Sequence, residues 1–156
     1  DALLPDEAVA TLRDLLLPRC TLLTPNLPEA ARLLDTAPAR SLDEIAAQGQ
    51  ALRALGAAAV LMKGGHADGP VCTDLLVTET GTNAFTAPRQ AVRHTHGTGC
   101  TLSAAIAAAM AQGQPLEAAT GIAHRYLQGA IAAAEGLGIG GGIGPVHHFH
   151  ALWPHG

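Results

Sequence analysis

A glycine-rich segment at the start of an apolar helix carries the residues best suited to chemistry. Gly97-Thr98-Gly99-Cys100 directly precedes an alanine-rich stretch. Glycines let the backbone approach a ligand closely, and the unpaired N–H groups of a helix start, together with the helix dipole, bind anions such as a phosphoryl group. The segment is not a P-loop, because no lysine follows the last glycine. The pattern predicts a phosphate site, with a plain glycine-rich turn as the alternative.

Cys100 falls in the first turn of the expected helix, where the positive end of the helix dipole favours an anionic thiolate. A thiolate at this position can take a proton from a substrate hydroxyl and act as a general base. A small buried apolar cysteine is the other interpretation, and the residue alone favours it. Cys100 is thus a candidate base whose role the local pattern does not decide.

Two more groups of polar residues follow expected strands. Lys63-Gly64-Gly65 comes directly after one buried strand. Ligands of parallel α/β sheets collect at the carboxyl ends of the strands, so Lys63 can reach a phosphate there. An ordinary solvated lysine is the alternative.

Asn26 and Glu29 come after the other strand and lie three residues apart, on one face of an emerging helix. The carboxylate and the amide suit Mg²⁺ held through water, because Mg²⁺ keeps much of its hydration. They also suit helix capping, with Asn26 as the N-cap and Glu29 as its partner in a capping box. The two interpretations are compatible.

Three histidines near the end of the chain resemble a metal cluster, namely His147, His148 and His150. His147 and His148 are adjacent, so their side chains point apart in a helix or a strand. We expect these histidines to pack or form hydrogen bonds at the end of the fold, and their role stays open.

Composition narrows the classes of protein. The chain has 156 residues, 14% of them charged, and a net charge of −4. No run of Lys or Arg could follow a nucleic-acid backbone, and no apolar stretch reaches the ~18 residues of a membrane span. The three cysteines, at positions 20, 72 and 100, are odd in number and widely spaced. This argues against a disulfide framework or a zinc site and predicts a cytoplasmic protein.

Hydrophobic periodicity and capping signals predict the elements that position these residues. They are a helix from Pro5 to Pro18, a strand at 20–24, a short helix after Pro28, a helix from Ser41 to about Leu55, a strand at 58–62, a hairpin of 71–79 and 82–86, and helices at 101–112 and 115–135. Apolar strands separated by helices indicate a parallel sheet. With no repeat and no linker, a single domain over residues 1–156 is expected.

Four segments, taken in order, resemble one family. Residues 23–30, 60–66, 96–104 and 142–150 are similar to hydroxymethylpyrimidine/phosphomethylpyrimidine kinase, a ribokinase-like family, and the resemblance runs along the whole chain. Most ribokinase relatives carry Asp where Cys100 stands. Cysteine at that position resembles the pyrimidine kinases and a related subset of pyridoxal kinases.

The resemblance implies a ribokinase-like three-layer α/β/α sandwich with a mostly parallel sheet. It implies ATP-dependent phosphorylation of 4-amino-5-hydroxymethyl-2-methylpyrimidine, and then of its monophosphate, in thiamine biosynthesis. In this family Cys100 would be the general base, the backbone N–H groups of residues 97–100, including Gly97 and Gly99, would form an anion hole, and Thr98 would line the phosphate path.

The remaining site residues follow from the same resemblance. Lys63 and Gly65 would bind the nucleotide, with Lys63 on the ATP phosphates. Asn26 and Glu29 would match the Asn-x-x-Glu motif, with Glu29 near Mg²⁺ through water. The pyrimidine and ATP are the implied small-molecule partners, and neither nucleic acid nor a membrane is expected.

The family carries a long amino-terminal part, with the first strands of the sheet and most pyrimidine-binding residues, before the point where this sequence starts. The expectation is a carboxy-terminal ATP-binding part that is weakly active or inactive alone, and that forms a homodimer or associates with the missing part. Two other functions stay open: a pyridoxal kinase of the same fold, and a truncated nucleotide-binding module without transfer activity.

Overall fold

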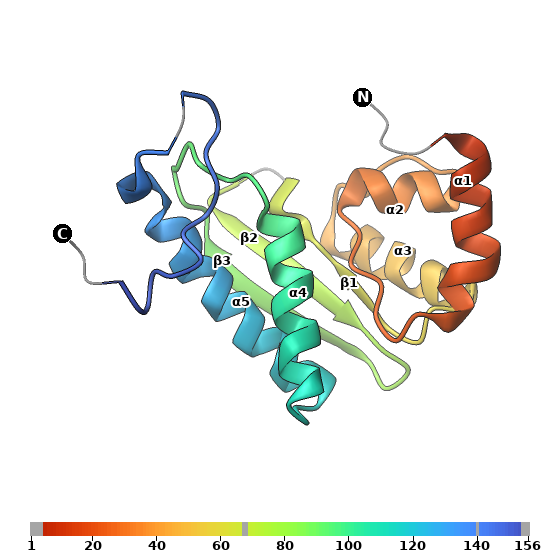
Figure 1. The fold of residues 1–156 in the computed structure, drawn as a ribbon. Helices are drawn as coiled ribbons and strands as arrows, with labels where there is room; N and C mark the ends of the chain where they lie inside the picture. Colours follow the sequence, from red (N-terminus) through yellow and green to blue (C-terminus); the bar gives the residue numbers. More distant parts are fainter. Residues whose placement is uncertain (1–4, 67–68, 140, 154–156) are drawn as a thin grey trace. The chain divides into compact units, whose positions relative to one another are not determined.

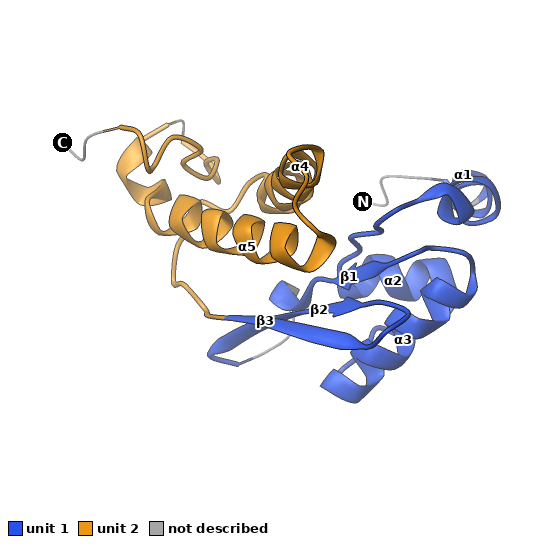
Figure 2. Ribbon diagram, turned by 90° about the horizontal axis from the view of Figure 1, so that it is seen from below, with its two compact units in different colours: residues 1–86 blue, residues 87–156 orange. Residues whose placement is uncertain are grey.

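The computed structural model describes residues 5–66, 69–139 and 141–153. The chain divides into two compact units, residues 1–86 and residues 87–156 (Figure 2). Each unit has its own helices, and the sheet lies in the first unit except for the last two residues of its third strand. Figure 1 shows the order of these elements along the chain. The single domain over 1–156 stays a prediction. No helix in the described ranges is long and apolar enough to cross a membrane.

The first unit begins with the predicted helix, which changes its winding along its length. The α-helix α1 (Asp6–Thr11) continues as the π-helix η1 (Leu12–Leu16) and the 3-10 helix η2 (Leu17–Arg19). Pro18 lies in the final turn and has no N–H to donate to the preceding turn, so the regular helix cannot continue. Its predicted end at Pro18 is confirmed to within one residue.

Two shorter helices follow, α2 (Leu27–Leu34) and α3 (Leu42–Ala54). The Ser41 side chain caps α3 by accepting the Glu44 N–H at 3.2 Å. The Glu44 carboxylate accepts the N–H of Arg40 at 2.6 Å. The predicted cap at Ser41 is therefore confirmed. The Glu44 carboxylate accepts from the residue before the cap and not from the cap itself.

The sheet has three strands in the order β1-β2-β3: β1 (Val60–Met62), β2 (Val71–Val77) and β3 (Thr82–Pro88). β1 pairs antiparallel with β2, with Val60 opposite Val77 and Met62 opposite Leu75. The hairpin predicted for residues 71–86 is confirmed, with β3 two residues longer than expected.

The mostly parallel sheet predicted from the strand–helix pattern is wrong for the described residues. Parallel neighbours need a crossover of about a dozen residues or more. The connections from β1 to β2 and from β2 to β3 are shorter than this, so each strand folds back on the one before it. The segment predicted as a strand at 20–24 is not a strand of the sheet. It runs beside residues 58–61 through three backbone hydrogen bonds and an isolated parallel bridge between Leu23 and Val60.

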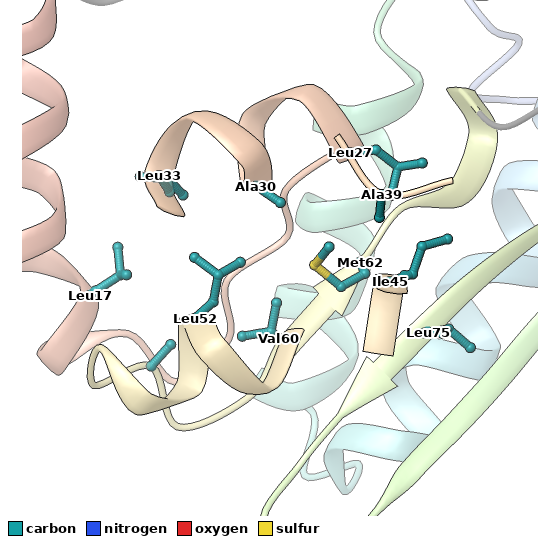
Figure 3. Packing of buried hydrophobic residues seen from close by; sticks show 11 residues of the cluster. Leu17, Leu27, Ala30, Leu33, Ala39, Ile45, Leu52, Val60, Met62 and Leu75 are labelled. Carbon is teal, nitrogen blue, oxygen red and sulfur yellow. The ribbon is translucent and has the colours of Figure 1, made fainter. Parts of the chain in front are cut away.

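The core of this unit lies between helices and sheet. Leu17, Leu52, Val60 and Met62 are fully buried and belong to one cluster with residues of α2 (Figure 3). Gly49 in the middle of α3 permits this packing, because a Cβ there would come within 2.7 Å of the Val77 side chain. The small residue brings α3 close to the strands that precede and follow the Lys63 segment.

The second unit contains two long helices, α4 (Thr98–Ala111) and α5 (Leu116–Ala132), followed by the 3-10 helix η4 (Ala134–Leu137). α4 and α5 pack side by side (Figure 1). Small residues such as Ala119 and Ala123 are buried on α5, and Leu102 and Ile106 are buried on α4.

Candidate active site

Asn26 and Glu29 form the capping box that their spacing predicts. The Asn26 Oδ1 accepts the backbone N–H of Glu29 at 2.8 Å. The Glu29 Oε2 accepts the backbone N–H of Asn26, also at 2.8 Å. The pair satisfies two N–H groups at the start of α2 and holds the Glu29 carboxylate in one place.

Lys63 lies beside this box. A parallel bridge joins Asn26 to Lys63, whose N–H donates to the Pro25 carbonyl at 2.9 Å. The Lys63 ammonium lies 3.9 Å from Glu29 Oε2, and its side chain is 18% exposed against 50% for Glu29. The backbone pairing thus gathers the predicted residues of this unit, with one cation and one carboxylate side by side.

The segment after Lys63 turns tightly against β2. Gly64 and Gly65 lie in the 3-10 helix η3 (Gly64–His66), and the N–H of Gly64 donates to the Asp74 carboxylate at 2.8 Å. A Cβ on Gly64 would lie 1.9 Å from the Thr73 carbonyl oxygen, whereas one on Gly65 would meet nothing within 4 Å. Gly64 is required by this close approach, and Asp74 holds the segment from a strand ten residues later.

The glycine-rich segment of the second unit is itself helical. The helix predicted to begin at Thr101 begins at Thr98, because Gly97 serves as the N-cap at φ 84°. Only glycine adopts this left-handed backbone without strain. Thr98, Gly99 and Cys100 therefore form the first turn of α4 instead of a preceding loop.

At the start of α4, two backbone carbonyls have side-chain hydrogen-bond donors, whereas two backbone amides have no acceptor among the described residues. Side-chain hydroxyls occupy two carbonyls, since Thr101 donates to Gly97 O at 2.8 Å and Ser103 donates to Gly99 O at 3.0 Å. Among the described residues no carbonyl accepts the N–H of Gly99 or of Cys100. Two amide donors at the positive end of α4 are thus left for an anion.

Cys100 is exposed, so the alternative of a buried core cysteine is wrong. Its first-turn position places it next to the two amides without an acceptor. The base assignment stays a prediction, but its main structural alternative is removed.

His147 and His150 pack at the end of the fold, as expected, whereas the His148 side chain is exposed and only its backbone forms a hydrogen bond. The N–H of His147 donates to the Ala130 carbonyl at 2.9 Å, and His147 lies edge-on to Trp153 at 5.1 Å. The His150 ring covers Gly129, where a Cβ would come within 2.4 Å of Nε2. The His148 carbonyl accepts the Tyr126 hydroxyl at 2.9 Å. In the described ranges no group of three metal-ligating residues forms.

Sequence reasoning did not select the residues that hold these segments from a distance. Asp74 supports the Lys63 segment, and His94 and Glu135 support the stretch before α4. No local pattern marks them, because their partners lie ten to fifty residues away in the chain.

Comparison with known families identifies the chain. The family model described as phosphomethylpyrimidine kinase matches residues 1–147. The chain belongs to the phosphomethylpyrimidine kinase family. This match includes every residue of the capping box, the Lys63 segment and the α4 start, and it confirms the family inferred from the four segments.

A relative with a kinase name supports the assignment to this family. The hydroxymethylpyrimidine/phosphomethylpyrimidine kinase of Escherichia coli (strain K12) is 53% identical over 153 residues, covering 98% of this chain and 58% of the relative. This chain therefore spans little more than half the length of that family member.

Solved structures of ribokinase-like kinases match the fold. An ADP complex of Bacillus subtilis pyridoxal kinase aligns with TM-score 0.88 and 29% identity over 96% of this chain and 57% of that one. A phosphomethylpyrimidine kinase from Clostridium difficile aligns with TM-score 0.71 and 32% identity over 84% of this chain and 52% of that one. The ribokinase-like part of the fold prediction is thus confirmed over part of the length of these kinases.

The capping box of Asn26 and Glu29 can be tested by protein stability, without an enzyme assay. Asn26→Ala removes the acceptor of the Glu29 N–H, so we expect the free energy of unfolding to fall by about 1 kcal/mol. Urea denaturation measures it. Asn83→Ala, an exposed amide on β3, is the matched control and should change the value by less than about 0.5 kcal/mol. Equal losses in both variants would contradict the capping role.

Proposed function

We propose that this chain forms the nucleotide-binding and catalytic part of an ATP-dependent kinase. Its substrates would be 4-amino-5-hydroxymethyl-2-methylpyrimidine and the monophosphate, in thiamine biosynthesis. The observation that carries the proposal is the start of α4, where an exposed Cys100 adjoins two amides without an acceptor. The relatives named as kinases of this pyrimidine and its phosphate support the substrate class.

Cys100 acts as the general base in this proposal. Its thiolate removes the proton of the substrate hydroxymethyl group, and the freed oxygen forms a bond to the γ-phosphorus of ATP. The bond between that phosphorus and the bridging oxygen breaks, and ADP leaves with the electron pair. An exposed thiol at the first turn can approach a substrate, which a core cysteine cannot.

The first turn of α4 stabilises the transferred group. The N–H groups of Gly99 and Cys100 donate to the phosphoryl oxygens, together with the positive end of the helix dipole. Gly97 sets the direction of this turn through its left-handed backbone, and Thr98 lines the path of the phosphoryl group. The contribution is mainly positioning and charge stabilisation, which dominate phosphoryl transfer.

Lys63 contacts the ATP phosphates, and Gly65 lets the nucleotide approach the backbone. The Lys63 side chain is mostly buried, so its ammonium is held near Glu29 instead of moving freely in solvent. Gly65 is exposed, and the space around its Cα is open. The ADP and AMP-PCP complexes of the structural neighbours support nucleotide binding by this fold.

The residues around Glu29 fit Mg²⁺ bound through water. Magnesium commonly uses one or two carboxylates, substrate phosphates and retained waters instead of a complete protein cage. Glu29 is half exposed, and its Oε2 is held by the Asn26 N–H. The bound ion would neutralise charge on the phosphates. Asn26 and Glu29 orient the water shell, and Lys63 supplies a second positive charge.

Glu29→Gln separates the magnesium role from the capping role. A glutamine oxygen can still accept the Asn26 N–H, so α2 keeps its box while the negative charge is lost. We expect an unchanged free energy of unfolding and a rise of about fivefold or more in the Mg²⁺ concentration for half-maximal turnover. The measurement is a magnesium titration of initial rates in the hybrid kinase described below, because the chain alone is expected to be weakly active or inactive. An unchanged titration would leave Glu29 with helix capping alone.

A hybrid kinase tests the proposed function as a whole. In this hybrid, the chain replaces the 153 residues of the Escherichia coli relative with which it aligns. We expect the hybrid to phosphorylate the hydroxymethylpyrimidine and its monophosphate, and the 156-residue chain alone to be weakly active or inactive. ATP binding without phosphorylation of any alcohol would support a truncated nucleotide-binding module. Full turnover by the chain alone would contradict the expected need for the rest of the protein.

Pyridoxal is the second candidate substrate, because the structural neighbours include pyridoxal kinases with TM-scores of 0.87 to 0.89. Parallel assays with equal concentrations of pyridoxal and the hydroxymethylpyrimidine decide between them. A kcat/KM at least about tenfold higher for the pyrimidine supports the main proposal, since one well-matched polar group can provide such discrimination. The reverse preference would reassign the substrate. A homodimer and a cytoplasmic location stay predictions.

A further inference from the structure

The stretch that leads into α4 is paired with the segment that follows α5. The N–H of His96 donates to the Gly144 carbonyl at 3.1 Å, and the His96 carbonyl accepts the N–H of Val146 at 3.4 Å. These bonds surround a parallel bridge between His96 and Pro145. His96 immediately precedes the N-cap Gly97, so the position of this pairing sets where α4 begins.

His94 strengthens the same pairing from its side chain. Its Nδ1 accepts the N–H of Gly144 at 2.7 Å, fifty residues away in the chain. Because Nδ1 accepts a hydrogen bond, the neutral ring carries its proton on Nε2. That nitrogen lies 3.7 Å from Glu135 Oε2, while Glu135 Oε1 accepts the backbone N–H of Arg93 at 2.6 Å. The His94 imidazole thus ties the stretch before α4 to Gly144, and the Glu135 carboxylate ties the same stretch to η4 through the Arg93 N–H.

The ring fits tightly against the backbone that it binds. A Cβ on Gly144 would lie 2.7 Å from His94 Nδ1 and 3.3 Å from the Ile139 carbonyl oxygen. The His94 side chain is 15% exposed. A residue other than glycine would push the ring away, so the close approach and the hydrogen bond depend on each other.

We infer that His94 is a positioning residue for phosphoryl transfer at the start of α4. Its Nδ1 fixes Gly144, Gly144 fixes His96 through the backbone bond, and His96 sets the position of Gly97 and of the first-turn amides. This inference rests on the proposed function. In this inference His94 acts through the backbone of Gly144 and not by contact with the nucleotide or the pyrimidine.

Two substitutions at position 94 separate the two ring nitrogens. An asparagine Oδ1 occupies nearly the position of Nδ1 and can accept the Gly144 N–H. A glutamine amide lies one bond farther out, near the position of Nε2, and leaves that N–H without its acceptor. His94→Ala removes both groups. His148→Asn, an exposed histidine of the same unit, is the control for loss of an imidazole.

In the hybrid kinase we expect His94→Ala and His94→Gln to lower kcat by about tenfold or more, because small misplacements of catalytic groups are costly. KM for the pyrimidine should stay within about twofold, and His94→Asn should keep nearly the parent kcat. A merely structural histidine would give three variants whose activities follow their Tm values. That result, or parent kcat in His94→Ala, would overturn the inference.

A second measurement does not depend on turnover. The ¹H–¹⁵N amide signals of residues 97–100 in the 156-residue chain report the geometry of the α4 start directly. They should move in His94→Ala and His94→Gln and stay in place in His94→Asn and His148→Asn. If the parent hybrid has no activity, the proposed function fails, and these signals still decide the positioning. Unmoved signals in His94→Ala would overturn it.

Discussion

Cys100→Ala is expected to lower kcat of the hybrid kinase by about 10²-fold or more, with little change in Tm. The side chain is exposed at the first turn of α4, so its truncation leaves no cavity in a core. The loss would then come from removal of the base and not from unfolding. Initial rates at saturating ATP, together with thermal melts, measure both quantities.

Other substitutions show whether proton removal is the function that is lost. Cys100→Asp supplies a carboxylate, which is also a base, and should retain more activity than Cys100→Ala. Cys20→Ala is the control for loss of a thiol, because Cys20 lies half-buried in the other unit and outside the proposed machinery. An unchanged kcat in Cys100→Ala would refute the general-base mechanism. The anion-binding amides of α4 would then be the remaining basis for catalysis.

Gly64→Ala is expected to destabilise the protein by about 3 kcal/mol or more, a fall of roughly 10 °C in Tm. The new Cβ would lie 1.9 Å from the Thr73 carbonyl oxygen, which is backbone and cannot rotate away. Relief requires η3 to separate from β2, and this breaks the bond from the Gly64 N–H to Asp74. Lys63 would lose its position beside Glu29, so nucleotide affinity should fall as well.

Gly65→Ala is the matched control for stability. It adds the same methyl group one residue later, where nothing lies within 4 Å of the new Cβ. Its Tm should stay within about 2 °C of the parent. Differential scanning calorimetry of the two variants makes the comparison. Equal Tm values in Gly64→Ala and Gly65→Ala would show that the segment after Lys63 is looser than this structure describes.

The sequence alone determined the elements and the family. Local signals were enough for the cap of α3 at Ser41, the hairpin of β2 and β3, and the capping box of Asn26 and Glu29. These features depend on residues within a few positions of one another, so spacing reveals them. The same holds for the family, whose motifs are short continuous segments.

Only the tertiary structure decided the sheet and the supports of the site. The strand–helix pattern suggested parallel strands, yet the short connections after β1 and β2 force antiparallel pairing. Asp74 and His94 carry no local signal, because each acts on a backbone amide far along the chain. Pairing between residues far apart in the chain depends on how the helices and strands pack. No short sequence pattern therefore reveals it. Gly64 and Gly144 are the clearest examples. A Cβ at either position would clash with an atom that only folding brings close, the Thr73 carbonyl oxygen and His94 Nδ1 respectively.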